Sequence, residues 1–137
     1  MSQINLIVAD MDRTVAFYRV LGLDIEDPPG SPHVAVTFAN GFSVEFDVSS
    51  SVEHWDAGWS RATGGNAVLG LQLDSAELVD QVFAALVAAG HRAHQRPFDA
   101  FWGGRYAIVD DPDGHPVGLM GPIDDARKHW PPVPPPS

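Results

Sequence analysis

The chain contains no cysteine, which excludes disulfides, zinc–thiolate sites and thiol catalysis. Basic residues are also scarce, because 8 Lys and Arg stand against 18 Asp and Glu and give a formal net charge of −10. A surface of this sign repels nucleic-acid phosphates, so no nucleic-acid partner is expected. It would attract a cationic ligand, although acidity of this kind also simply keeps a protein soluble.

Long apolar runs are missing as well. Asp10, Asp12 and Arg13 interrupt the apolar N-terminal stretch, so no signal peptide is visible. No run approaches the length of a membrane span. We therefore expect a cytoplasmic protein without a membrane partner, and the 45% apolar content of its 137 residues is enough for one packed domain.

The first half, residues 1–48, predicts a β-α-β-β-β module. Apolar residues alternate along residues 4–8, which is strand periodicity, and then recur on one helical stripe along residues 11–21. A short strand is expected at residues 23–25. A hairpin follows over residues 34–48, with Asn40-Gly41 as a two-residue turn.

The second half, residues 67–122, repeats the plan. A strand at residues 69–73 is followed by a helix capped by Ser75, a strand at residues 91–95 and a hairpin around the turn Asp111–Gly114. A shift of 65 positions lays the first strand of one module on that of the other. The fold class is therefore α+β. In each module the helix packs on one face of the sheet, so the other face must pack against something else.

Two segments lie outside the modules. The linker, residues 49–66, is polar and Gly-rich, yet Trp55 and Trp59 indicate that it packs back on the body. The tail, residues 123–137, ends in "PPVPPPS" and is expected to be extended and mobile.

Two stretches carry a family resemblance. "VADMDRTVAFYRVLGLDI" (8–25) and "FWGGRYAIVDDPDGHPVGLM" (101–120) look like the vicinal oxygen chelate superfamily of glyoxalase I, extradiol dioxygenases and bleomycin-resistance and related antibiotic-binding proteins. The likeness covers the chain to about residue 122. It implies paired modules whose curved mixed sheets form a barrel-like cleft with the helices outside, and it implies a homodimer.

Metal-dependent members of that superfamily hold a divalent ion with four side chains, from the first and last strand of each module. The resemblance places these positions on Gln3 and Glu45 in the first module, which are acceptable ligands, and on Val68 and Gly118 in the second. Neither Val68 nor Gly118 can coordinate a metal through its side chain. We therefore expect no metal and no cofactor, unless a residue such as His54 replaces the missing ligands.

The remaining histidines offer no evident chelating pair, since His91 and His94 fall on opposite faces of a strand. Glu45 and Asp47 share a face and could form an acid–base pair, with Glu45 as the only candidate base. A solvated cleft wall is the simpler interpretation of these carboxylates.

The expected cleft suits an organic ligand better than an ion. Its rim would carry aromatic Phe101 and Trp102, which could stack on a flat ring or only pack the modules together, and Arg105, which could equally be an edge-strand charge. Its predicted lining is Gln3, Asn5, Ile7, Glu45, Asp47, Val68, Gly70, Gln72, Tyr106, Ile108, Gly118 and Met120.

These observations favour a protein that binds a small organic ligand, aromatic or cationic and antibiotic-like, in a metal-free cleft by sequestration. The alternative is an enzyme: a divergent metal-dependent lyase or dioxygenase, or a metal-free isomerase with Glu45 as base. A structural or interaction module is the third class.

Overall fold

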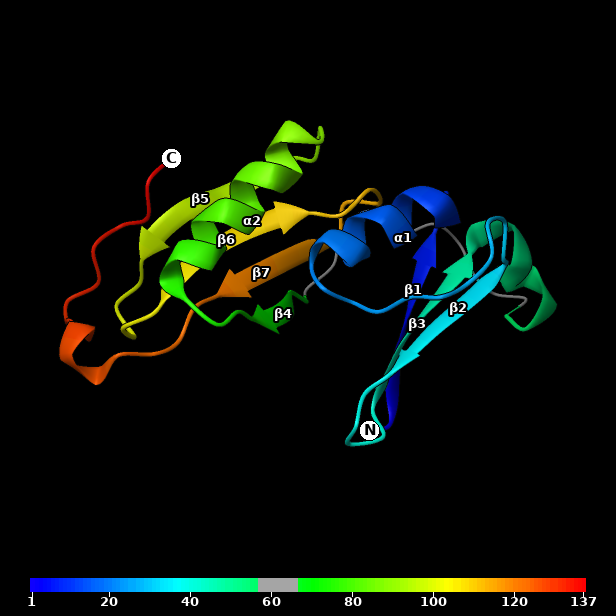
Figure 1. Cartoon of the computed structure of the whole chain (residues 1–137), viewed down its shortest axis with the longest axis horizontal. Helices are drawn as coiled ribbons and strands as arrows, with labels where there is room; N and C mark the ends of the chain where they lie inside the picture. The colour runs from blue at the N-terminus through cyan, green and yellow to red at the C-terminus, as the bar shows by residue number, and fades with distance from the viewer. Residues whose placement is uncertain (57–66) are drawn as a thin grey trace. The chain divides into compact units, whose positions relative to one another are not determined.

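The computed structural model describes residues 1–56 and 67–137 and consists of two compact units, Met1–Thr63 and Gly64–Ser137 (Figure 1). The first unit contains β1 (Gln3–Val8), α1 (Met11–Val20), β2 (His33–Thr37), β3 (Ser43–Val48) and the 3₁₀ helix η1 (Ser49–His54). The second contains β4 (Leu69–Gln72), α2 (Ala76–Ala88), β5 (Ala93–Asp99), β6 (Arg105–Asp110), β7 (Pro116–Met120) and the 3₁₀ helix η2 (Asp125–Arg127).

The first unit forms a sheet in the order β1-β3-β2, with β1 parallel and β2 antiparallel to β3. Asp10 caps α1 by accepting a hydrogen bond from the Arg13 backbone N–H at 3.1 Å. Helix and sheet pack through aromatic rings: the Tyr18 and Phe46 centroids lie 4.8 Å apart, and both side chains are buried.

The strand expected at residues 23–25 is absent from the described sheet. The Ile25 carbonyl instead accepts hydrogen bonds from Nε of Arg19, at 3.0 Å, and from Nη2 of the same guanidinium. Pro28 and Pro29, a few residues on, have no N–H to offer a ladder. Leu23 and Ile25 are buried nevertheless, so the segment fills the core as irregular chain.

The β2–β3 hairpin is confirmed, but its turn is longer than the two residues expected. The Phe38 N–H donates to the Phe42 carbonyl at 2.8 Å, and the Gly41 N–H donates to the Phe38 carbonyl at 2.9 Å. Three residues therefore form the loop. Gly41 has φ of +84°, the conformation that a loop of this length requires at its last position.

The second unit forms a sheet in the order β4-β7-β6-β5, and α2 packs across one face of it (Figure 1). The Ser75 cap is confirmed, since its hydroxyl accepts from the Leu78 N–H at 3.1 Å. Buried Phe83 and Leu86 of α2 pack with the interior of the sheet, whose buried apolar residues are Ala107, Val109, Val117 and Leu119.

The β6–β7 turn is organised by a buried carboxylate. The Asp111 side chain has no exposed surface, and it accepts hydrogen bonds from the backbone N–H groups of Asp113 and His115 at 2.9 and 2.8 Å. Its other oxygen lies 2.6 Å from Nδ1 of His115. One side chain thus fixes the backbone and the imidazole of the same turn.

This pair predicts a pH dependence of stability. The hydrogen bond to Asp111, aided by its charge and that of Asp113, raises the pKa of His115 above 6.5, and burial opposes the shift. A raised folded-state pKa means that the stabilisation is complete below the unfolded value and is lost as pH rises through the folded value. The free-energy difference between wild type and His115→Asn, from urea unfolding, should therefore shrink between pH 5.5 and 8.5. A difference that is constant across this range would contradict the prediction.

The tail, expected to be extended and mobile, makes specific contacts. The Asp124 N–H donates to the Gly103 carbonyl at 3.0 Å, and the His129 N–H donates to the Phe101 carbonyl at 3.0 Å. Further on, Nε2 of Gln95 in β5 donates to the Pro136 carbonyl at 2.8 Å. The tail therefore lies against the loop before β6 and against β5.

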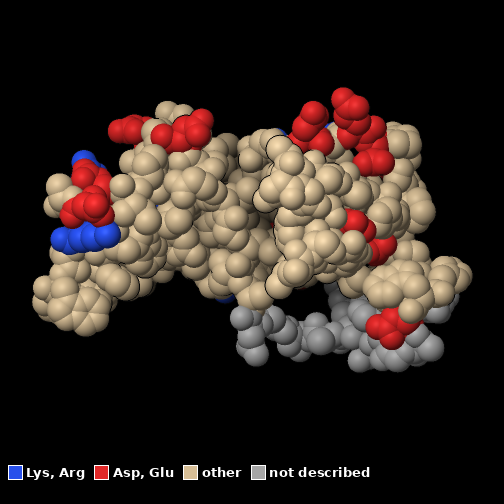
Figure 2. Space-filling model, turned by 90° about the horizontal axis from the view of Figure 1, so that it is seen from below, with Lys and Arg blue, Asp and Glu red and all other residues tan. Residues whose placement is uncertain are grey.

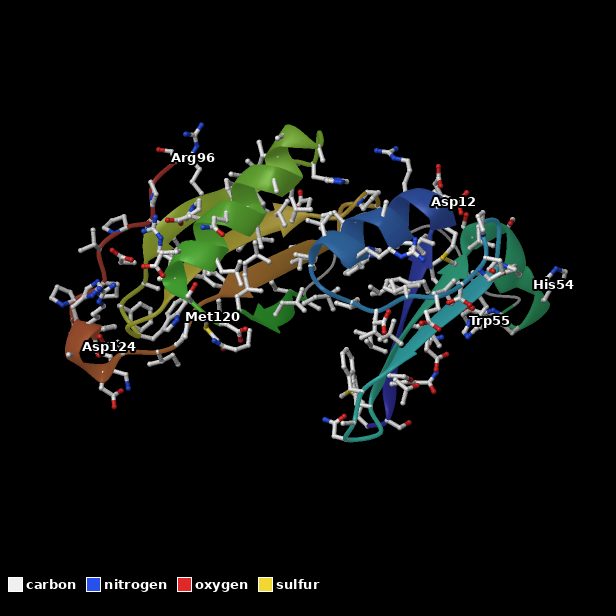
Figure 3. The ribbon with its side chains drawn as sticks, viewed as in Figure 1. Asp12, His54, Trp55, Arg96, Met120 and Asp124 are labelled. Carbon is white, nitrogen blue, oxygen red and sulfur yellow. The ribbon has the colours of Figure 1, made fainter. Side chains whose placement is uncertain are left out.

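Where it is described, the linker packs back on the body as expected, but through Val52 of η1, which is fully buried and belongs to a helix that contacts β1 and β3. Trp55, at the end of η1, is instead 56% exposed, and neighbouring His54 is exposed too (Figure 3). Trp59 lies outside the described residues.

The predicted α+β class with two modules of the same plan is confirmed. In the described part of the chain, neither α-helix has the length and apolarity needed to cross a bilayer. Acidic side chains are scattered over the face seen in Figure 2, in keeping with the net charge.

Candidate functional site

The face of the first sheet opposite α1 carries polar side chains. Gln3 and Asn5 project from β1, and Glu45 and Asp47 project from β3, at positions that alternate with buried residues such as Phe46. The parallel register places Asn5 directly beside Glu45. The structure therefore brings these four predicted site residues together.

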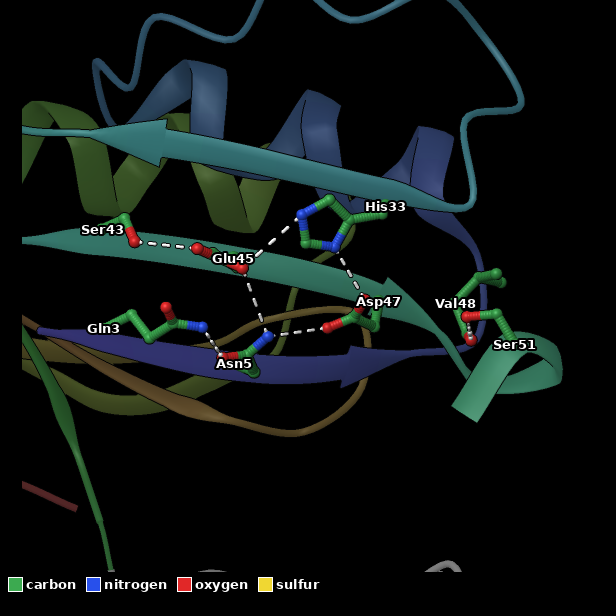
Figure 4. A network of polar contacts seen from close by, with 8 residues as sticks. All are labelled: Gln3, Asn5, His33, Ser43, Glu45, Asp47, Val48 and Ser51. Carbon is green, nitrogen blue, oxygen red and sulfur yellow. Dashed lines mark hydrogen bonds and ion pairs between the residues drawn. The ribbon is translucent and has the colours of Figure 1, made fainter. Parts of the chain in front are cut away.

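Hydrogen bonds connect these side chains (Figure 4). Nδ2 of Asn5 donates to Oδ2 of Asp47 at 2.9 Å and approaches Oε2 of Glu45 at 3.5 Å. Gln3 donates to Oδ1 of Asn5 at 2.8 Å, and the Ser43 hydroxyl donates to Oε1 of Glu45 at 3.0 Å. Amide and hydroxyl donors thus converge on the two carboxylates.

His33 also belongs to this polar face, although it was not among the residues expected there. Its Nδ1 lies 2.8 Å from Oδ1 of Asp47, and its Nε2 lies 3.5 Å from Oε2 of Glu45. The signal that could have found it is the hairpin register, since His33 and Asp47 are equally distant from Asn40 and face each other across the two strands. The face can therefore hold a cationic group or move a proton.

The two hairpins correspond residue by residue. Loop 111–115 repeats the hydrogen bonds of loop 38–42: its first N–H donates to its last carbonyl at 2.9 Å, and its fourth N–H donates to its first carbonyl at 3.0 Å. Counting onward from either loop, Gly118 takes the place of Glu45. The structure gives the same correspondence as the sequence repeat.

The parallel strands extend this correspondence. Asn5 of β1 lies beside Glu45, and Gly70 of β4 lies beside the counterpart of Glu45 in β7. Two residues earlier along the chain are Gln3 and Val68. The polar face of the first sheet is thus replaced, position by position, by small and apolar residues in the second.

This replacement bears on the four-ligand metal site that the family resemblance implies. Val68 and Gly118 offer no ligand atom in a side chain, and a Cβ built on Gly118 would lie 2.5 Å from the Tyr106 hydroxyl and 3.0 Å from Cε2 of the same ring. Over residues 1–56 and 67–137, no group of three or more His, Asp or Glu is arranged to hold a metal. The residues at the four positions therefore do not fit that ligand set.

A hollow of about 420 Å³ lies over the second sheet where those ligands are missing. Trp102 and Tyr106 meet edge to face at one side of it, with ring centroids 5.2 Å apart. Burial raises the pKa of Tyr106, so its phenol remains protonated at neutral pH. The residues that line the hollow are Val68, Gly70, Leu71, Gln72, Trp102, Tyr106, Gly118 and Met120.

Two residues expected at the rim do not line the hollow. Arg105 pairs with Asp80 of α2 at 2.9 Å and with Asp99 at 3.3 Å, so its guanidinium is held by α2, which packs on the other face of the sheet. Phe101 is 41% exposed and packs edge to face on Trp102 and on Trp130 of the tail. Phe101 therefore supports Trp102, which lines the hollow, but does not line the hollow itself.

Solved structures match this fold over most of the chain. A glyoxalase-related enzyme from Fulvimarina pelagi is 22% identical with a TM-score of 0.75, over 89% of this chain and 87% of that one. A glyoxalase/bleomycin resistance protein/dioxygenase family enzyme from Burkholderia phytofirmans gives 22% and 0.75, over 88% and 96%. Lactoylglutathione lyase from Agrobacterium tumefaciens gives 18% and 0.63, over 88% and 92%. At these identities the likeness extends to the fold alone.

No curated protein sequence matches the chain significantly. A family profile does: that of the Glyoxalase/Bleomycin resistance protein/Dioxygenase superfamily matches residues 1–119. This match spans both units and includes each of the four positions discussed above. The chain therefore belongs to the glyoxalase/bleomycin resistance protein/dioxygenase superfamily.

Proposed function

We propose that this protein binds a small organic molecule in the hollow of its second sheet, that it does so without a divalent metal, and that it acts by sequestration. The observation that carries the proposal is the Tyr106 ring standing over Gly118, where a metal-binding side chain would begin. A volume of about 420 Å³ lies within the range of small-molecule sites. Trp102 and Met120 supply the aromatic and polarisable surface that such ligands contact.

Titration with a panel of aromatic and cationic antibiotics, followed by calorimetry and tryptophan fluorescence, tests this proposal. We expect saturable binding that is unchanged by EDTA. Trp102→Leu removes an aromatic contact and should weaken binding about 2- to 12-fold. Trp130→Leu is the matched control, since Trp130 is 78% exposed and does not line the hollow. Binding or turnover that EDTA abolishes and one divalent ion restores would contradict the metal-free proposal.

The polar face of the first sheet favours a second candidate, proton transfer by Glu45 in a lyase or isomerase reaction. The supporting observation is the approach of His33 and Asn5 to the same Glu45 oxygen, at 3.5 Å each, which would hold the carboxylate in place. Glu45→Gln separates the candidates, because it should abolish a Glu45-dependent activity and leave binding in the hollow unchanged.

A further inference from the structure

The Tyr106 hydroxyl occupies a defined place in the hollow. It lies 2.5 Å from the position that a Cβ on Gly118 would take, so it stands directly over the sheet at that residue. Its ring packs edge to face with Trp102, with centroids 5.2 Å apart, and with Phe98, with centroids 6.2 Å apart. The hydroxyl is therefore positioned by packed aromatic neighbours before any ligand arrives.

This hydroxyl is free to bond to a ligand. Among residues 1–56 and 67–137 it makes no hydrogen bond, and burial is the sole cause of its raised pKa. The other polar groups of the lining are less available: the Gln72 amide donates to the Leu73 carbonyl at 3.3 Å, and Nε1 of Trp102 is buried beside Gly104. A ligand in the hollow thus meets one positioned O–H donor in apolar surroundings.

We infer that Tyr106 selects, for the binding site proposed above, flat aromatic ligands that carry an uncharged oxygen acceptor, such as a ring carbonyl, over Gly118. The inference rests on the proposed function and names the ligand class. A phenol that remains protonated at neutral pH donates to such an oxygen. Its apolar surroundings strengthen that bond and penalise a ligand that leaves the hydroxyl unpaired.

Two probes of the same two-ring outline test this selection: coumarin, which has a ring carbonyl, and naphthalene, which has no acceptor. Both are titrated into the full-length ¹⁵N-labelled protein, with amide shifts in β4 and β7 as the readout. In Tyr106→Phe, the affinity for coumarin should fall about 2- to 12-fold, as expected for one hydrogen bond, and that for naphthalene should change less than about twofold. Tyr18→Phe, at the only other tyrosine, should change neither.

Gly118→Ala provides a second variant, because its methyl group displaces the Tyr106 hydroxyl without removing it. The affinity for coumarin should again fall more than the affinity for naphthalene. Unchanged coumarin affinity in Tyr106→Phe, or equal losses for both probes, would overturn the inference and leave the binding site standing. If neither probe shifts β4 and β7 amides in the wild type, the proposed site fails and the inference fails with it.

Discussion

Asp111→Ala is expected to lower the free energy of unfolding by about 2–4 kcal/mol, measured by urea unfolding with circular dichroism. The substitution removes a side chain with no exposed surface that accepts from two backbone N–H groups and lies 2.6 Å from Nδ1 of His115. Those donors would remain in a part-buried turn without their acceptor. The loss should be larger than that of an ordinary surface hydrogen bond, because the acceptor is charged.

The control for this prediction is Asp74→Ala, an exposed carboxylate of the same unit, which should change stability by less than about 0.5 kcal/mol. The first hairpin shows that a turn of this kind uses a side-chain acceptor. There the exposed Phe38 takes the position of Asp111, and Asn40 is the residue that accepts from the Phe42 N–H, at 3.0 Å. An Asp111→Ala loss no greater than the Asp74→Ala loss would show that backbone hydrogen bonds alone hold the turn.

Sequence reasoning predicted the features that depend on short-range chemistry. The predicted capping residue Ser75 accepts from an N–H three residues on, so the pattern that predicts it is local. Both hairpins were likewise readable from alternation on either side of a turn. The repeat then placed Val68 and Gly118 at the counterparts of the polar positions, and the strand registers agree.

The features that were missed depend on contacts between distant residues. A short strand was expected at residues 23–25, but there the Ile25 carbonyl accepts from the Arg19 guanidinium instead of from a neighbouring strand. Arg105 was expected at the rim, and Asp80 of α2, which is 25 residues away, holds it elsewhere. Secondary-structure propensities and apolar periodicity do not predict which side chains will pair in this way.

The central feature of the hollow was also beyond the sequence. Tyr106 was expected on the correct face, but the sequence gives no indication that its hydroxyl stands over Gly118. That placement depends on a side-chain rotamer fixed by Trp102 and Phe98. The absence of a ligating side chain at residue 118 could be predicted from the sequence. That the Tyr106 hydroxyl occupies its place could not.

Gly70→Leu is expected to block the hollow while leaving the fold intact. A Cβ built on Gly70 meets nothing within 4 Å, so a larger side chain can extend into the space where the ligand would lie. A ligand forced to share this space should lose affinity by about 5- to 150-fold, the equivalent of overpacking by about 1–3 kcal/mol. The variant should be at least as stable as wild type, because glycine within a strand costs about 0.5–1 kcal/mol.

Calorimetry with the ligand found in the antibiotic panel, together with thermal unfolding, measures both effects. Gln81→Leu is the matched control, since it adds the same side chain at an exposed site on α2, which packs on the opposite face of the sheet. The comparison separates a blocked site from a general effect of added apolar surface. Wild-type affinity in a stably folded Gly70→Leu protein would mean that the ligand binds elsewhere, and the polar face around Glu45 would then become the leading site.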